Sequence, residues 1–318
     1  MATADRAFGL LVSLALVSSA ILLALLAALL PHALAFLGGG TADPTELVAL
    51  LVLVLATLGV GLGLSSLFRQ LLATLFLIRG LLARRIATPR RVAAAARQLG
   101  LEPRVDVVRD PRPFSFCYWF LRPRICLSTG LIGRLDEAEL GAVLLHERYH
   151  LRQRDPLRLV VARYFAAGLY VVPVVEELVE YYTLQKEIAA DQDAVGALGG
   201  VRELASALYK VLPEADDISL GLLSPVGSLS VTEARIDQLV DGRAVPLVLS
   251  RASVALSGGA LAAASILALA GARFEVGAEG LAPLFTVPGL LGSASFLFAA
   301  AVTGAVQQVR LVAHGPAE

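Results

Sequence analysis

Residues 136–152 read DEAELGAVLLHERYHLR, and this stretch decides the fold around it. Its apolar side chains Leu140, Val143 and Leu144 recur at helical spacing, so they would line one face of a helix. Asp136 or Leu135 precedes an acidic first turn, formed by Glu137 and Glu139, and negative charge there favours a helix N-terminus. We therefore predict a helix over residues 136–152 that packs its apolar face against a core.

Two histidines lie four residues apart on this predicted helix. His146 and His150 would project from the same face, one turn apart, where two ring nitrogens can hold a tetrahedral zinc ion. Glu147 follows the first histidine and could take a proton from a water at the metal. The chain has only four histidines, so two of them at ligand spacing form a specific signal. The alternative is a helix surface that binds no metal.

A catalytic zinc ion needs a third protein ligand and one open position. The predicted helix from Glu176 to Val195 carries Glu187 and Asp191, four residues apart and therefore on one face. Glu187 can supply the third ligand, and Asp191 can accept a hydrogen bond from a ligand histidine. Solvated acids on a charged helix are the alternative. His32 and His314 lie at opposite ends of the chain and are poor ligand candidates.

The composition is that of a membrane protein rather than a soluble domain. The 318 residues are 57% hydrophobic and 17% charged, and the net charge of zero gives no reason to expect nucleic-acid binding. Four apolar runs are each about long enough to cross a bilayer as a helix. They are Gly9 to Leu30, Leu47 to Phe68, Ala252 to Gly271 and Leu281 to Val306. The first run is too long for a signal peptide, so we expect it to be retained.

Arginines are placed unevenly around these runs. The loop from Pro31 to Glu46 has neither lysine nor arginine, whereas arginines cluster from Arg69 to Arg97. The positive-inside rule then puts both termini and the segment from Arg79 to Arg251 in the cytoplasm. We predict a multi-pass plasma-membrane protein with three parts: a membrane hairpin over residues 1–80, a cytoplasmic domain over 81–250 and a second membrane hairpin over 251–318.

The apolar run from Leu157 to Val175 does not fit this scheme simply. Arg158 and Arg163 interrupt it, Pro173 limits it, and an arginine near the centre of a span is costly. A helix at the membrane interface and a buried helix of the cytoplasmic domain both remain open.

The segment before the histidine helix predicts a small antiparallel sheet. Strands are expected at Arg104 to Arg109, within Phe114 to Leu121 and at Ile125 to Leu127, with a turn at Arg122-Pro123-Arg124. A helix is expected from Arg90 to Leu99, between Pro89 and Gly100. The sheet can be simple core structure, or its edge can pair with a substrate backbone. Cys117 and Cys126 are expected to be buried and not joined.

Arg235 is a further candidate for the site. Its cation could stabilise the oxyanion of a tetrahedral intermediate. A charge on a helix surface is the favoured interpretation, because such charges are common.

Three pieces of the chain resemble the gluzincin membrane peptidases, most closely antirepressors of the BlaR/MecR type. They are Leu121-Arg122-Pro123-Arg124-Ile125, the region from Ile132 to Leu157 with HERYH and RQRDPL, and Glu187 to Asp191. The resemblance implies a mainly α membrane protein with an α+β gluzincin-like protease domain facing the cytoplasm. It also implies His146, His150 and Glu187 as zinc ligands, Glu147 as general base and acid, and Asp191 as a support for a ligand.

The resemblance further implies a protein or peptide substrate, with a winged-helix repressor as one candidate and a homodimer as one candidate assembly. The chain after Val306 is too short for a penicillin-binding sensor domain, so we do not expect β-lactam sensing. The competing hypothesis is a non-proteolytic membrane signal transducer with a structural or vestigial zinc site. A protease site inside the bilayer is disfavoured by the charges around the motif, from Asp136 to Arg154.

Overall fold

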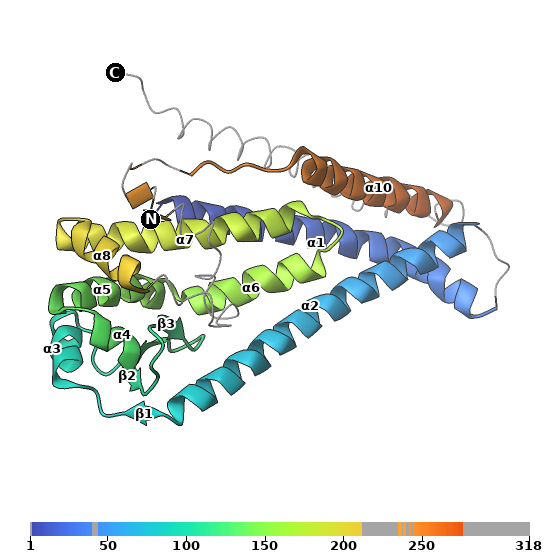
Figure 1. Cartoon of the computed structure of the whole chain (residues 1–318). Helices are drawn as coiled ribbons and strands as arrows, with labels where there is room; N and C mark the ends of the chain where they lie inside the picture. The colour runs from blue at the N-terminus through green and yellow to red at the C-terminus, as the bar shows by residue number, and fades with distance from the viewer. Residues whose placement is uncertain are drawn as a thin grey trace, which may run out of the picture. The chain divides into compact units, whose positions relative to one another are not determined.

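The computed structural model describes residues 2–39, 44–211, 235–236, 238–239, 242 and 245–275 (Figure 1). The chain divides into two compact units that alternate along the sequence. The first unit comprises residues 1–7, 68–161 and 181–245, and the second comprises 8–67, 162–180 and 246–318. The division at residues 80 and 250 that the sequence suggests stays a prediction.

Long apolar helices build the second unit. Helix α1 covers Ala2–Leu37 and α2 covers Pro44–Leu82, and within them Thr3–Leu37 and Glu46–Leu82 are long and apolar enough to cross a membrane. Helix α2 leaves Leu51, Val60 and Leu64 more than half exposed, which suits contact with lipid rather than water.

Two of the four predicted spans therefore coincide with helices of sufficient length. The third lies in helix α10, Arg251–Glu275, whose described apolar part, Arg251–Leu267, is shorter. The fourth, Leu281 to Val306, lies outside the described residues. Four transmembrane helices are not confirmed.

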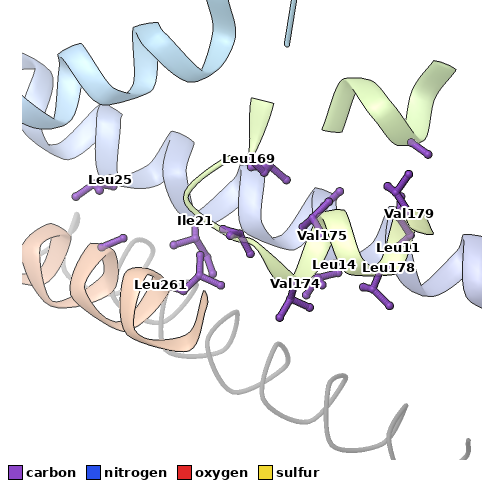
Figure 2. Packing of buried hydrophobic residues seen from close by; sticks show 14 of the residues in the cluster. Leu11, Leu14, Ile21, Leu25, Leu169, Val174, Val175, Leu178, Val179 and Leu261 are labelled. Atoms are coloured by element: carbon purple, nitrogen blue, oxygen red, sulfur yellow. The ribbon is translucent and has the colours of Figure 1, made fainter. Parts of the chain in front are cut away.

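The core of the second unit joins α1 to α7, Val174–Leu198, and to α10 (Figure 2). Leu11, Leu14 and Ile21 recur at helical spacing along α1 and are almost fully buried. They belong to one cluster with Val175 of α7 and Leu261 of α10. Apolar packing thus fixes the first membrane-length helix against the N-terminal part of α7.

The ambiguous run from Leu157 to Val175 is two helices rather than one. Helix α6, Asp155–Gly168, ends before Pro173, and α7 begins directly after Pro173. A proline has no backbone N–H to donate within a helix, so it separates the two helices. Gly168 packs closely on α2: a Cβ placed on Gly59 would lie 2.7 Å from the Gly168 carbonyl oxygen. Glycine is therefore required where these two helices approach each other.

The first unit contains a four-stranded sheet with the order β1-β2-β4-β3. The strands are β1 (Arg85–Ile86), β2 (Val105–Val108), β3 (Ser115–Tyr118) and β4 (Arg124–Ser128). β2 and β4 are parallel, and the other two pairs are antiparallel. The predicted strands are present, but the prediction of an antiparallel sheet was wrong. β3 and β4 form the expected hairpin, and β4 then inserts between β3 and β2, which leaves β3 as the outer strand.

Alternating side chains put the sheet between two apolar clusters. Val107, Ile125 and Cys117 belong to one cluster with α3, Arg90–Gln98, and α5, Glu137–Gln153. Phe116 and Cys126 belong to the other, with residues from the end of α2. The cysteines are buried and free, as predicted, and they lie on opposite faces because side chains alternate along a strand.

Asp106 carries a buried charge on the second of these faces. Tyr118 and Arg124 both donate hydrogen bonds to its carboxylate, and Arg85 lies 2.7 Å from it. Burial alone would raise the pKa of Asp106, but the bonds from Arg124 and Tyr118 outweigh it and lower the pKa. The sheet is therefore tied together by a charged network as well as by apolar packing.

The predicted helices around the site are confirmed. Helix α5 begins with a capping box in which Asp136 and Glu139 bond each other's backbone, and it ends where Arg154 adopts φ 55°. Helix α3 begins after Pro89, as expected. Two shorter helices, α4 (Thr129–Arg134) and α8 (Arg202–Val211), complete the described part of the unit.

Candidate metal centre

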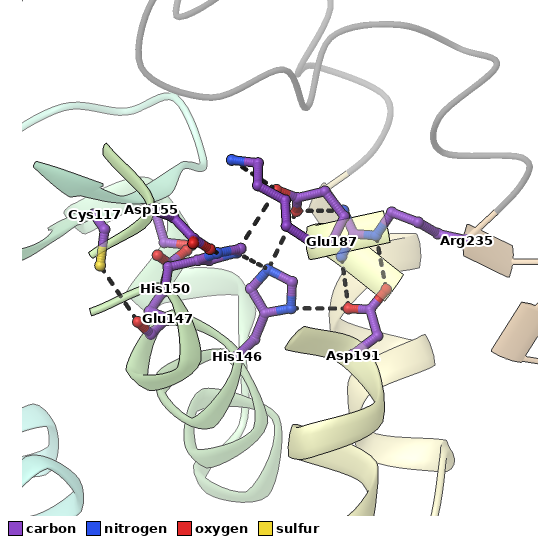
Figure 3. A network of polar contacts seen from close by, with 10 residues as sticks. Cys117, His146, Glu147, His150, Asp155, Glu187, Asp191 and Arg235 are labelled. Atoms are coloured by element: carbon purple, nitrogen blue, oxygen red, sulfur yellow. Dashed lines mark hydrogen bonds and ion pairs between the residues drawn. The ribbon is translucent and has the colours of Figure 1, made fainter. Parts of the chain in front are cut away.

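Three ligand atoms from α5 and α7 converge in the interior of the first unit (Figure 3). The Nε2 atoms of His146 and His150 are 3.1 Å apart. Glu187 Oε2 lies 3.5 Å from His146 Nε2, and its Oε1 lies 3.7 Å from His150 Nε2. The four-residue spacing puts both rings on one face of α5, and α7 brings the carboxylate to them.

This arrangement fits a tetrahedral zinc ion. With metal–ligand distances of about 2.0–2.2 Å, neighbouring ligand atoms lie about 3.3–3.6 Å apart, close to the three separations above. The donor set is two imidazoles and one carboxylate, which is typical of zinc sites that keep a position open for water or substrate. All three side chains are buried. The residues present are therefore suited to zinc.

Each ligand histidine has a carboxylate behind it. His146 Nδ1 lies 2.8 Å from Asp191 Oδ1, and His150 Nδ1 lies 2.6 Å from Asp155 Oδ2. A carboxylate at Nδ1 favours the proton on that nitrogen and leaves Nε2 free to act as a ligand. The sequence indicates Asp191 for this position but gives no comparable signal for Asp155.

Asp155 comes close to His150 because α5 ends one residue earlier. The left-handed conformation of Arg154 reverses the chain, so Asp155 opens α6 and points back to the ring. A spacing of five residues does not indicate proximity on a continuous helix. Only the Asp-Pro pair at 155–156, which favours a helix start, could have suggested a break here.

Burial and charge act in opposite directions on these groups. Burial alone lowers the pKa of His150, but Glu187 and Asp155 outweigh it and raise the pKa to about 10. Burial likewise lowers the pKa of His146, and Asp191 and Glu187 raise it overall. Burial raises the pKa of Glu187, yet the two histidines hold it well below its ordinary value. The carboxylate is therefore charged at neutral pH, and metal binding would release the imidazole protons because ligand nitrogens must be deprotonated.

Arg235 belongs to this buried network, so the interpretation as a surface charge was wrong. Its side chain is 4% exposed, and its Nε and Nη2 atoms each lie 2.8 Å from an oxygen of Asp191. Nη1 lies 3.7 Å from Glu187 Oε2. A planar guanidinium suits this two-point contact. No local sequence pattern around Arg235 predicts the contact with Asp191.

Glu147 lies beside the cluster and contacts the sheet. It is 4% exposed; its Oε1 accepts a 2.8 Å hydrogen bond from Ser115 Oγ, and Oε2 has no hydrogen-bond partner in the described part of the chain. The Cys117 thiol donates to the Glu147 backbone carbonyl. Ser115 and Cys117 come from β3, so the outer strand runs directly past this carboxylate. Sequence reasoning did not single out Ser115, and its place in a predicted strand was the only signal.

Lys186 is a third residue of the site that the sequence did not reveal. It is buried, and its Nζ lies 3.5 Å from Glu187 Oε1. Together with Arg235 it offsets part of the negative charge of the acidic side chains around the histidines.

Comparisons with known proteins agree with this geometry. A family model described as BlaR1 peptidase M56 matches residues 24–239, which include every residue of the cluster. A protease HtpX homolog from Acidiphilium cryptum is 38% identical over 97 residues, which are 28% of this chain and 33% of that protein. One from Moorella thermoacetica is 29% identical over 146 residues, or 35% and 49% of the two chains. One from Methanothermobacter thermautotrophicus is 26% identical over 152 residues, or 40% and 59%. The matched region thus spans a third to about three fifths of these relatives.

Proposed function

The chain belongs to the BlaR1 peptidase M56 family, and from that premise we propose that it is a zinc-dependent endopeptidase that cuts a protein or peptide at the cytoplasmic face of the membrane. The observation that carries the proposal is the convergence of His146, His150 and Glu187, with separations that suit zinc and with Glu147 alongside. A purely structural site would not need that fourth side chain.

His146, His150 and Glu187 would hold the metal. When bound, zinc would supply Lewis acidity that makes a water nucleophilic at neutral pH. Glu147 takes the proton from the attacking water and delivers it to the leaving amine nitrogen. The hydrogen bond from Ser115 to Oε1 fixes this carboxylate and leaves Oε2 free to receive the proton.

The surrounding charges hold this machinery in place. Asp191 and Asp155 orient the two imidazoles, and Arg235 holds Asp191 through two hydrogen bonds. We keep a second role for Arg235: Nη1, the nitrogen that Asp191 does not engage, could donate to the oxyanion of the tetrahedral intermediate.

The proposal extends to location and biology. The arginine distribution supports a plasma-membrane protein with its catalytic domain in the cytoplasm, and the apolar helices α1 and α2 support membrane insertion. The BlaR/MecR resemblance supports a regulatory role in which a winged-helix repressor is cleaved, and a homodimer as the assembly. These finer points rest on sequence patterns and on the family.

The test is to compare wild-type protein with Glu147→Gln in the native membrane and to identify the protein termini that depend on the wild-type chain. The variant should bind zinc as wild type does and generate none of the new termini. Glu137→Gln, on the exposed first turn of the same helix, is the matched control and should cut normally. New termini at the wild-type rate from Glu147→Gln would refute the assignment. Zinc binding without any wild-type cleavage would favour the signal transducer.

A further inference from the structure

A pocket of about 990 Å³ opens on the first unit, lined by the turn between β3 and β4 and by the end of α5. Five of the side chains that line it are arginines, and none is acidic. The residues that matter here are Arg104, Arg122, Arg124, Arg152, Arg154 and Trp119. Such a concentration of one charge around a hollow creates a strong local potential for anions.

Most of this positive charge is not neutralised within the described chain. Arg124 is bound to Asp106. Arg104, Arg122 and Arg152 are exposed and form no ion pair with any described residue, and the same holds for Arg154. Arginines that serve only to keep a protein surface soluble normally lie far apart or alternate with acidic residues, because like charges repel. Four unpaired ones facing one hollow point to an anionic ligand.

Both sides of the pocket are continuous along the chain with elements that form the metal centre. On α5, Leu151 and Arg152 directly follow His150, and Arg154 precedes Asp155. On the sheet, Trp119 directly follows β3, whose first residue, Ser115, bonds Glu147. An extended peptide lying along β3 would cover about 13 Å from Ser115 to the pocket, at about 3.3 Å per residue. Side chains three to five positions from the cleaved bond would then reach the arginines.

The backbone at the pocket is held in an unusual conformation. Trp119 and Arg154 have φ values of 65° and 55° and are the only non-glycine residues with positive φ in the described part of the chain. Residues other than glycine seldom adopt positive φ values, and those that do are concentrated at functional sites. Both residues line the same pocket, one from each side.

From these observations we infer that the arginine pocket binds an acidic segment of the substrate and makes the enzyme selective for peptides with carboxylates on one side of the cleaved bond. This inference rests on the proposed function. A hollow of this size fits a peptide chain with several carboxylates better than it fits the flat surface of a bilayer. Guanidinium groups can hold carboxylates through two parallel hydrogen bonds. Trp119 and Leu121, which are both exposed, offer apolar surface for the aliphatic parts of glutamate side chains.

The binding step can be tested without any cleavage. Trp119 is the only tryptophan in the chain, so its fluorescence reports on the pocket alone. Glu147→Gln protein in phosphatidylcholine nanodiscs would be titrated with a peptide that carries three glutamates and with the same peptide carrying glutamines. We expect the acidic peptide to shift the emission and to bind at least about tenfold more tightly, with an affinity that falls as salt screens the charges.

Matched variants identify the arginines. The double variant Arg122→Gln with Arg152→Gln should weaken acidic-peptide binding by about two- to fivefold for each arginine, the range for exposed charge pairs. The control is Arg90→Gln with Arg109→Gln, which removes the same charge from exposed positions outside the pocket. It should bind the acidic peptide as the unmodified protein does. Equal losses in both double variants would overturn the inference.

Cleavage then tests selectivity. Zinc-loaded wild-type protein would receive peptides with the glutamates on either side of the cleaved bond and the glutamine version. One acidic peptide should be preferred, and the Arg122/Arg152 double variant should lose that preference. Equal cleavage of all three peptides would overturn the inference and leave the proposed peptidase function intact. The same holds if phosphatidylglycerol in the nanodiscs shifts the Trp119 emission and the acidic peptide does not. If no peptide is cut, the proposed function fails instead.

Discussion

Removal of the carboxylate behind His150 should weaken zinc binding although that carboxylate is not itself a ligand. Asp155 is 2% exposed, and its Oδ2 lies 2.6 Å from His150 Nδ1, a distance typical of a strong, charge-assisted hydrogen bond. Asp155→Asn keeps an acceptor of the same shape but loses the charge, whereas Asp155→Ala loses both.

The expected size follows from comparable partners of metal-bound histidines, whose loss costs about 10–100-fold in metal affinity. We expect the zinc dissociation constant to rise about tenfold in Asp155→Asn and to approach 100-fold in Asp155→Ala. At about 1.4 kcal/mol per tenfold, these are losses of about 1.4 and 2.8 kcal/mol.

Competition for zinc against a chromogenic chelator measures these constants directly. Asp193→Asn is the matched control, because Asp193 is also partly buried but its ion-pair partner is Arg148, at 3.9 Å, and not a ligand histidine. The zinc affinity of this variant should stay within twofold of wild type. Thermal unfolding of each zinc-free variant shows whether it is folded. Should folded Asp155→Asn and Asp155→Ala both bind zinc as tightly as wild type, the carboxylate does not position His150.

Three further predictions follow from the buried charges and thiols. Arg235→Lys cannot reproduce the two-point contact with Asp191, so we expect about three- to tenfold weaker zinc binding by the same chelator assay; unchanged zinc affinity with a lower turnover would instead favour the oxyanion role. The lowered pKa of Asp106 means that its charge stabilises the fold above the unfolded pKa of about 3.9, and that this stability is lost as the pH falls through the lower folded value. Asp106→Asn should therefore melt below wild type at pH 7, with the difference shrinking below pH 4, and a difference that stays constant with pH would contradict the assignment. Burial raises the pKa of both thiols, that of Cys126 to about 12, so Cys117 and Cys126 should resist alkylation at pH 8 until the protein unfolds; rapid labelling of the native protein, followed by mass spectrometry, would show the burial to be wrong.

The part of the site that sequence could predict depends on spacing within single helices. The period of 3.6 residues brings His146 and His150 to one face, and it does the same for Glu187 and Asp191. The capped helix over residues 136–152 was predictable for the same reason, since its acidic first turn and apolar stripe are local features. The meeting of the two pairs was inferred from the chemistry of zinc, which needs a third ligand.

The remainder depends on contacts between distant segments. Nothing near Arg235 in the sequence announces that it meets Asp191, 44 residues earlier, and a lone arginine is more often exposed. The order of the sheet was missed because strand patterns show which residues alternate but not which strand lies in the centre. Asp155 was missed because a single left-handed residue, Arg154, breaks the helical spacing.

The central claim is that one zinc ion is held by His146, His150 and Glu187. X-ray absorption at the zinc edge of the purified protein tests it most directly. We predict a shell of light atoms at about 2.0–2.2 Å with two imidazoles and no sulfur at about 2.3 Å, and one imidazole fewer in His150→Gln. A sulfur-containing shell, or a spectrum unchanged by both His150→Gln and Glu187→Gln, would contradict the account.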